Sequence, residues 1–261
     1  MTPVVDDRSM KGRHALVTGG GRGIGLAVAQ IFAAHGATVS LVGRTMSTLE
    51  EARDGTEFGG GIAVADVTDA ASVDDAVSTL SAGHGAFDIL VNNAGAAESA
   101  PFKATDPELW SRMIAVNLTG TYNVTRAALK GLTSAPAGRI INIASTAALK
   151  GYAYVTAYSA AKHGVLGLTR SLALELARTA VTVNAICPGF TETDLLSGSI
   201  EKITEASSLS AEDARAQLVS VNPQGRFIEP REVAETALWL CSDAARSVTG
   251  QAITLAGGEV M

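Results

Sequence analysis

Short runs of apolar, β-branched residues alternate along the chain with longer segments of helical periodicity. The short runs predict seven strands, at residues 15–18, 38–42, 62–65, 89–92, 140–144, 181–187 and 252–255. At least six helices are expected between them, with the clearest patterns at residues 24–35, 73–80, 107–132, 155–178 and 230–240. Such alternation is typical of βαβ units. We therefore expect an α/β protein with one doubly wound, seven-stranded parallel sheet and helices on both faces.

No linker, repeat or change of composition divides the chain, so we expect a single domain spanning residues 1–261. Its 47% hydrophobic content is enough for a full core. Residues 1–11 are expected to form a flexible tail. Residues 190–228 are rich in Ser, Thr and Glu and predict two loosely anchored helices over a site. They would form a substrate lid that is mobile without ligand.

The net charge of −6 and the scattered Lys and Arg residues argue against a nucleic-acid face or an anionic-membrane surface. No stretch reaches the ~18 apolar residues of a membrane helix, and residues 1–14 lack an apolar leader, so a cytoplasmic protein is expected. Cys187 and Cys241 lie in apolar sequence and are expected to be buried free thiols. The four histidines show no metal-ligand spacing, so no metal site is predicted.

A glycine-rich segment directly follows the first predicted strand and opens a helix, since residues 18–25 read Thr-Gly-Gly-Gly-Arg-Gly-Ile-Gly. Backbone amides at a helix N-terminus in this position can hold a pyrophosphate. The spacing of Gly19, Gly23 and Gly25 is Gly-x-x-x-Gly-x-Gly, which differs from the common dinucleotide fingerprint. A glycine-rich turn without a ligand is the alternative interpretation.

This segment resembles the Thr-Gly-x-x-x-Gly-Ile-Gly motif of the short-chain dehydrogenases/reductases. Further motifs extend the resemblance over nearly the whole chain: Asp-Val at 66–67, Asn-Asn-Ala-Gly at 92–95 and Pro-Gly-Phe-Thr-Glu-Thr at 188–193. The resemblance implies a Rossmann-type domain that both binds a dinucleotide and carries the catalytic site. It also implies these cofactor-binding residues: Gly19, Gly21, Arg22, Gly23, Ile24, Arg44, Asp66, Val67, Asn93, Ala94, Gly95, Val116, Tyr158, Lys162, Pro188, Gly189, Thr191 and Thr193.

Tyr158 and Lys162 lie four residues apart on one predicted helix, so their side chains can converge on one site. A nearby ammonium, together with an oxidised nicotinamide, would lower the phenol pKa toward neutrality, where a general acid/base works best. An isolated Tyr-x-x-x-Lys often arises by chance. Ser145 changes that balance, because it ends the fifth predicted strand, and the carboxyl ends of such strands face the ligand crevice.

The resemblance completes a catalytic set of Asn117, Ser145, Tyr158 and Lys162. Ser145 would fix the substrate carbonyl while Tyr158 transfers the proton. Asn117 stands inside a predicted helix shortly before Gly120, where a kink is expected, and in the family the matching Asn holds a water that links the lysine to solvent. The substrate side is expected to comprise Ser145, Phe190, Leu195 and Leu196.

The end of the second predicted strand bears on the choice of cofactor. No acidic residue stands between Thr38 and Leu49 to accept the ribose hydroxyls of NAD(H). Arg44 instead offers a planar set of donors suited to a 2′-phosphate, Gly43 leaves room beside it, and Arg22 can approach the same group. NADP(H) is therefore the preferred cofactor and NAD(H) the alternative. A solvated Arg44 that leaves the site indifferent is the opposing interpretation.

The combination predicts an NADP(H)-dependent oxidoreductase that reduces a ketone to a secondary alcohol by hydride transfer, with Tyr158 as general acid/base. The motifs resemble most the β-ketoacyl reductase and polyketide ketoreductase branch, which implies a 3-oxoacyl thioester or polyketide-like carbonyl as substrate. An NAD-dependent secondary-alcohol dehydrogenase and a non-catalytic dinucleotide-binding scaffold are the alternatives, and the intact catalytic set disfavours the scaffold. An extended epimerase or dehydratase would need a larger substrate domain than residues 189–228 provide.

Small residues along the predicted helix at 155–178 permit close helix packing, either inside the chain or against a second copy. They are Ala157, Ala160, Ala161, Gly164 and Gly167. The family's habit of forming dimers and tetramers favours a homodimer or homotetramer. No nucleic-acid or membrane partner is expected.

Overall fold

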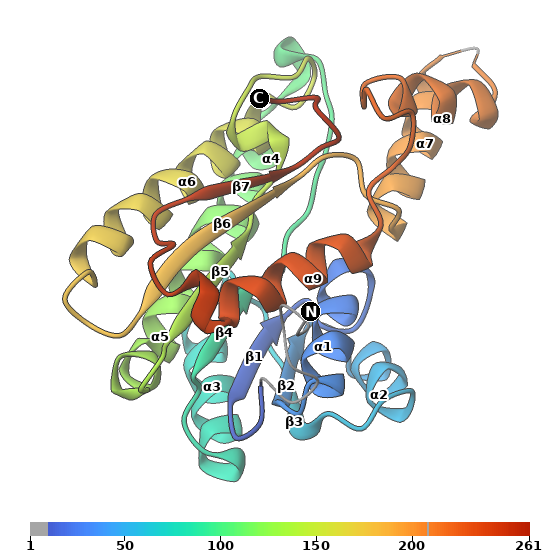
Figure 1. The fold of residues 1–261 in the computed structure, drawn as a ribbon. Coiled ribbons are helices and arrows are strands. Elements are labelled where there is room, and N and C mark those ends of the chain that lie inside the picture. The colour runs from blue at the N-terminus through green and yellow to red at the C-terminus, as the bar shows by residue number, and fades with distance from the viewer. Residues whose placement is uncertain (1–9, 208) are drawn as a thin grey trace.

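The computed structural model describes residues 10–207 and 209–261, which form one parallel sheet of seven strands with helices around it (Figure 1). The strands are β1 (His14–Thr18), β2 (Thr38–Gly43), β3 (Gly59–Val64), β4 (Ile89–Asn92), β5 (Arg139–Ile143), β6 (Thr182–Pro188) and β7 (Ala252–Leu255). Their order in the sheet is β3-β2-β1-β4-β5-β6-β7. The doubly wound parallel sheet expected from the sequence is confirmed.

The helices are α1 (Gly23–Ala34), α2 (Met46–Asp54), α3 (Ala70–His84), α4 (Pro107–Ile114), α5 (Gly120–Ser134), α6 (Thr156–Glu175), α7 (Asp194–Ala206), α8 (Ala211–Val219) and α9 (Pro230–Cys241). The two helices expected within residues 190–228 are α7 and α8. The single helix expected at 107–132 is divided, because a π-helical turn at Ala115–Thr119 separates α4 from α5. The helix is thus irregular at Asn117, where the sequence predicts a kink.

The third strand differs from its predicted bounds. β3 begins at Gly59, because pairing with β2 imposes extended structure on three glycines of low strand propensity. It ends at Val64, so Asp66 and Val67 follow the strand instead of closing it.

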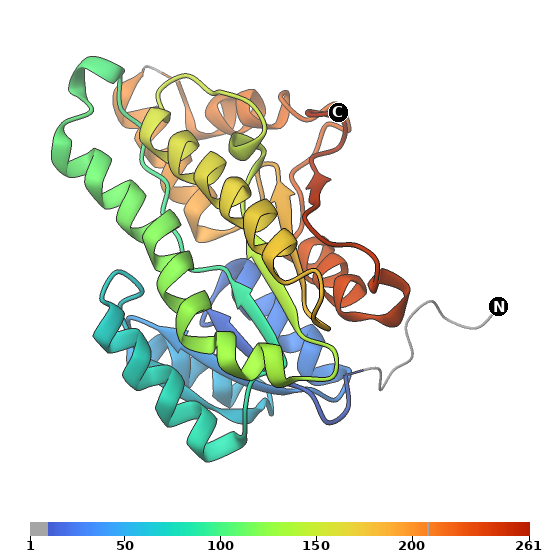
Figure 2. The ribbon, with the colours of Figure 1, turned by 90° about the vertical axis from the view of Figure 1, so that its left-hand side faces the viewer.

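Two helical layers enclose the sheet. α1, α2 and α9 pack on one face, and α3, α5 and α6 on the other, where Figure 2 shows them in front of the strands. One apolar core joins Phe32 of α1 to Leu238 of α9, and a second joins Val77 of α3 to Leu132 of α5. All five residues of β1 are buried, including the polar His14 and Thr18 at its ends, since a central parallel strand is covered on both sides.

Part of the predicted tail and of the small-residue stripe is held within the chain. Residues 1–9 lie outside the described residues, but Met10 is buried and its N–H donates to His35 O at 3.1 Å. Ala157 and Ala161 are buried, and a Cβ on Gly164 would lie 2.6 Å from a methyl group of Leu118. These stripe positions therefore pack inside the chain.

The strand order reverses between β1 and β4, which opens a crevice at their carboxyl ends. The Thr18 hydroxyl accepts hydrogen bonds from the N–H groups of Asn93 and Ala94, both at 3.0 Å. The Asn93 amide donates in turn to the carbonyls of Thr18 and Gly19, both at 3.1 Å. The two loops that leave β1 and β4 are thus fixed to each other beneath the crevice.

Candidate active site

A cleft of about 530 Å³ opens at this edge of the sheet, between the glycine-rich turn, the ends of β2 and β4, and α7. Most of the predicted cofactor-binding residues line it: Gly19, Gly21, Arg22, Gly23, Ile24, Arg44, Asp66, Val67, Asn93, Ala94, Gly95, Val116 and Thr193. Pro188, Gly189 and Thr191 lie at and beyond the end of β6, and Tyr158 and Lys162 lie in α6; these five are not part of the lining.

The N-terminus of α1 reaches the cleft through Gly23 and Ile24. No side chain caps this helix, and its first turn carries no acidic residue. Gly23 has a φ of +55°, and a Cβ on Gly25 would lie 2.3 Å from Gly19 O, so both positions require glycine. Free N–H groups at the positive end of a helix dipole attract phosphate. The donors present here fit the pyrophosphate of a dinucleotide.

Two arginines stand on the same side of the cleft. Arg44 follows β2 and is exposed, and it forms no ion pair among residues 10–207 and 209–261. Hydrogen bonds from Thr68 lower the pKa of Asp66, and the charge of Arg44 contributes to the same shift. Arg22 lies 3.6 Å from Asp194 of α7, in an ion pair that is exposed on both sides. Arg44 is therefore the cation better placed for a further anionic group.

The predicted catalytic residues come together where β5 and α6 meet. Ser145 lies two residues beyond the end of β5, and its side chain stands close enough to Tyr158 to oppose the burial that raises the pKa of the phenol. Lys162 is buried, and its Nζ donates to Ile143 O at 2.8 Å and lies 5.7 Å from the centre of the Tyr158 ring. A Cβ on Gly95, which lines the cleft, would be 3.7 Å from this Nζ. Lys162 thus lies beside the cleft, and the other two predicted catalytic side chains lie close to it.

The electrostatics of this group differ from the sequence-based expectation. Burial raises the pKa of Tyr158, and the hydrogen bond from Ser145 only partly opposes it. Burial lowers the pKa of Lys162 to about 8. The expected lowering of the phenol pKa by Lys162 is therefore not seen in the protein alone, because the ammonium contacts a backbone carbonyl instead of the phenol oxygen.

Asn117 lies in the π-helical turn and is fully buried. Its Nδ2 donates to Ala96 O at 2.9 Å and to Met113 O at 3.0 Å, and its Oδ1 accepts from Ala96 N at 3.3 Å. These bonds tie the turn to the segment that follows β4. A Cβ on Gly95 would lie 2.8 Å from Asn117 Oδ1, so Asn117 and Lys162 flank the same glycine.

The three predicted substrate residues beyond β6 take different positions. Leu195 lines the main cleft and is 49% exposed. Leu196 is buried and borders a smaller cavity of about 240 Å³, together with Arg215. Phe190 is half-buried and lines neither cavity. Of these three, Leu195 is the one that the structure places in the cleft.

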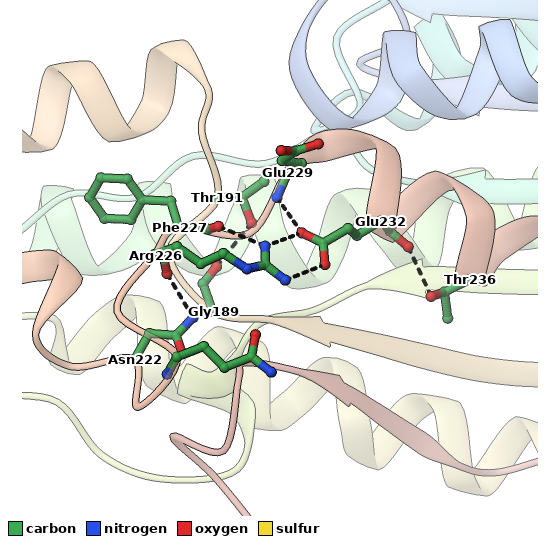
Figure 3. A network of polar contacts seen from close by, with 9 residues as sticks. Gly189, Thr191, Asn222, Arg226, Phe227, Glu229, Glu232 and Thr236 are labelled. Carbon is green, nitrogen blue, oxygen red and sulfur yellow. Dashed lines mark hydrogen bonds and ion pairs between the residues drawn. The ribbon is translucent and has the colours of Figure 1, made fainter.

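The chain returns from α8 to α9 through an anchored segment (Figure 3). Arg226 pairs with Glu232 of α9 at 2.6 Å, and Glu232 also accepts the N–H of Glu229 at 2.8 Å, which caps the helix. Asn222 donates to Arg226 O at 2.8 Å. The two ends of the segment that carries α7 and α8 are also joined directly, since Thr191 pairs with Ile228 as an isolated bridge.

Several cleft residues escaped sequence reasoning. Glu98 and Ser99 line the cleft just beyond the Asn-Asn-Ala-Gly motif, and Val155 lines it before α6. Lys202 lines it from α7, one helical turn after Gly198. Helical spacing from Leu195 could have indicated Lys202. No local signal marks the others.

A metal site and a membrane-spanning helix can be assessed only within the residues that the structure describes. Within them no group of three or more His, Cys, Asp or Glu side chains could hold a metal ion. None of the described helices is long and apolar enough to span a bilayer. Cys187 and Cys241 are free and buried, as expected.

Comparison with known proteins agrees with this arrangement. A family described as enoyl-(acyl carrier protein) reductase matches residues 19–259. D-β-hydroxybutyrate dehydrogenase of Cupriavidus necator is 40% identical over 255 residues, which cover 96% of this chain and 99% of that protein. The granaticin polyketide synthase putative ketoacyl reductase 1 of Streptomyces violaceoruber is 42% identical over 251 residues, with 94% and 92% covered. A variant of actinorhodin polyketide ketoreductase, solved with NADPH, has a TM-score of 0.89 and 36% identity and covers 98% of each chain. The protein is therefore an oxidoreductase of the short-chain dehydrogenase/reductase family.

Proposed function

We propose that the protein reduces a ketone to a secondary alcohol with NADPH, and that Tyr158 is its general acid. One observation carries this proposal: Ser145, Tyr158 and Lys162 lie together beside a cleft whose lining fits a dinucleotide. A non-catalytic scaffold would not need these three side chains close together. The scaffold is therefore the weaker candidate.

The nicotinamide of the bound cofactor would supply the hydride. The Ser145 hydroxyl donates a hydrogen bond to the substrate oxygen and holds it near Tyr158. The pKa of Tyr158 is raised, so the phenol stays protonated and can give its proton to that oxygen. The Lys162 ammonium then stabilises the phenolate that remains. Asn117 would hold the water through which the proton is replaced.

Arg44 supports the choice of NADPH over NADH, because a guanidinium binds a 2′-phosphate and no carboxylate of the described chain pairs with it. The substrate class rests on the relatives. Two of the proteins compared are ketoreductases of polyketide synthesis by name, which favours a 3-oxoacyl thioester or a polyketide-like ketone. The similarity to D-β-hydroxybutyrate dehydrogenase favours the second candidate, oxidation of a secondary alcohol.

Replacing Tyr158 by Phe tests the proposal. The variant removes the acidic proton and keeps the ring, so kcat with a ketone panel should fall by ~10²–10⁴-fold. Binding of NADPH, followed by its fluorescence, should persist. Tyr122→Phe, an exposed tyrosine on α5, is the matched control and should leave kcat unchanged. Near-normal turnover by a folded, cofactor-binding Tyr158→Phe enzyme would refute the proposal.

A further inference from the structure

A buried carboxylate lies just beyond β7. The chain turns sharply there: Gly257 and Gly258 have φ values of +58° and +94°, and the N–H of Glu259 donates to Ala256 O at 3.0 Å. This turn points the Glu259 side chain inward, where it is only 2% exposed. A buried carboxylate is costly unless it is paired and hydrogen-bonded. Its partners therefore indicate what it does.

Both partners come from the loop between β5 and α6. The Nζ of Lys150 lies 3.2 Å from the Glu259 carboxylate, and the Tyr152 hydroxyl donates a hydrogen bond to it. The same Nζ stands 4.8 Å from the centre of the Tyr152 ring. Burial, followed by the hydrogen bond to Glu259, raises the pKa of Tyr152, so its phenol remains a donor. The carboxylate thus holds both residues of the loop at once.

The contact continues from Tyr152 toward the catalytic serine. The Tyr152 oxygen lies 2.7 Å from the hydroxyl of Thr146, which is buried and directly follows Ser145. The Ser145 hydroxyl accepts the N–H of Ala147 at 3.1 Å. A shift of Tyr152 would therefore move the short turn that orients Ser145.

The other side of Glu259 faces the segment that follows β6. The N–H of Gly189 donates to Leu255 O at 2.9 Å, and a Cβ on Gly189 would lie 3.1 Å from Glu259 Oε2. Gly257 is packed as closely against the return of the lid, because a Cβ there would lie 1.9 Å from Asn222 Oδ1. Figure 3 shows Gly189 and Asn222 within the network that anchors this return.

We propose that Glu259 is a positioning residue for the reaction. It holds the loop that carries Ser145 against the segment at Gly189, through Lys150 and Tyr152, and so sets the distance between the serine and the cofactor. This inference rests on the proposed function, because it assigns Glu259 a role only in a reaction that uses Ser145. Loss of Glu259 should therefore change kcat and should not change the binding of the nucleotide part of the cofactor.

Glu259→Ala tests the inference. We expect kcat to fall by ~10- to 100-fold, since small misplacements of a positioning group have effects of this size, with the Kd of NADPH unchanged. Glu259→Gln retains an acceptor for Tyr152 and should recover part of the loss. Glu235→Ala, which removes an exposed carboxylate paired with Arg231 on α9, is the control and should leave kcat unchanged. If Glu259→Ala does not fold, Tyr152→Phe replaces it as the test variant. It removes only the hydroxyl that bonds Glu259, and it should also lower kcat.

A double-mutant cycle with Ser145→Ala separates positioning from general stability. If Glu259 acts through Ser145, its removal should cost little further activity once the serine is absent. Additive losses, or an unchanged kcat in both Glu259→Ala and Tyr152→Phe, would overturn the inference. An inactive Tyr158→Phe beside unimpaired Glu259→Ala and Tyr152→Phe enzymes overturns this inference alone. A fully active Tyr158→Phe overturns the proposed function instead.

Discussion

Lys162 buries an ammonium group against the carbonyl oxygen of Ile143 at 2.8 Å, and burial lowers its pKa to about 8 from an ordinary 10.5. The unfolded chain therefore binds more protons than the folded one between these two values. The folded state gains stability as the pH rises through this window, and below pH 8 the full cost of the buried charge is present. We expect this loss of stability to serve the reaction, because the buried ammonium lies 5.7 Å from the centre of the Tyr158 ring and would stabilise its phenolate.

From this we predict opposite effects of pH on activity and on stability. The kcat for ketone reduction should decline above pH 8 as Lys162 loses its proton, while the free energy of unfolding rises. Lys162→Met should lose both the activity and this rise in stability. A pH profile of kcat and thermal unfolding over the same range measure the two effects. A kcat that stays flat well above pH 8 would contradict the assignment.

At the same scale, we expect Arg44 to govern the choice between NADPH and NADH. A charge-assisted contact to a 2′-phosphate contributes ~1.5–3 kcal/mol, so kcat/KM should favour NADPH over NADH by at least about tenfold. Arg44→Asp should reverse the preference, because a carboxylate repels the phosphate and accepts the ribose hydroxyls. Arg53→Asp on α2, beside Asp54, is the control and should keep the preference. An unmodified enzyme that uses NADH equally well would refute the role of Arg44.

Among the elements, the helix pair α7 and α8 is held least firmly. Figure 1 shows the pair standing out from the layers that cover the sheet. The ion pairs that tie it to the body, Arg22 with Asp194 and Arg215 with Glu192, are exposed and contribute little. Its anchors are the ends near Thr191 and Arg226.

We therefore predict that the pair opens locally when no cofactor is bound. Trypsin should cleave after Lys202 of α7 or Arg215 of α8, and NADPH should slow this cleavage, since Lys202 lines the cleft. Cleavage after Arg178, in the exposed turn beyond α6, provides the internal reference and should not respond to NADPH. Equal rates at Lys202 with and without NADPH would show a permanently docked pair.

At the scale of the whole molecule, two arginines join the sheet to α9 at the edge opposite the site. Arg139, which begins β5 and is 3% exposed, donates to Leu240 O at 3.1 Å and to Gly138 O at 2.8 Å. Arg13 donates to Cys241 O at 2.8 Å. The two cations satisfy carbonyls at the negative end of α9.

Arg139→Met should therefore reduce stability without altering the chemistry. Leaving these buried carbonyls without donors should lower the free energy of unfolding by ~2–4 kcal/mol, while kcat per folded molecule stays the same. Denaturant unfolding measures the first quantity. Arg231→Met, at an exposed i,i+4 pair on α9, is the control and should change stability by less than ~0.5 kcal/mol. A loss of kcat in Arg139→Met would show that this edge communicates with the site.

The sequence by itself determined the elements and the chemistry at their ends. Mainly apolar runs predicted all seven strands, because a strand covered on both faces is rich in apolar residues, and β4 and β7 have the predicted bounds. The glycine-rich turn and Ser145 followed from position, since the residue after a parallel strand lies at the ligand edge. The weak helix propensity around Asn117 indicated an irregularity in the helix, and the structure has a π-helical turn there.

Only the tertiary structure decided which side chains meet. Periodicity places a residue on a face of its own helix, but it does not say what packs there, so Leu196 proved to lie away from the cleft and Lys162 to contact Ile143. Tyr152 and Glu259 are 107 residues apart, and they meet because the turn after β7 and the loop after β5 lie at the same end of the sheet. Such contacts join residues that are far apart in the sequence, and they depend on how the sheet and its helical layers pack together. No local sequence pattern encodes them.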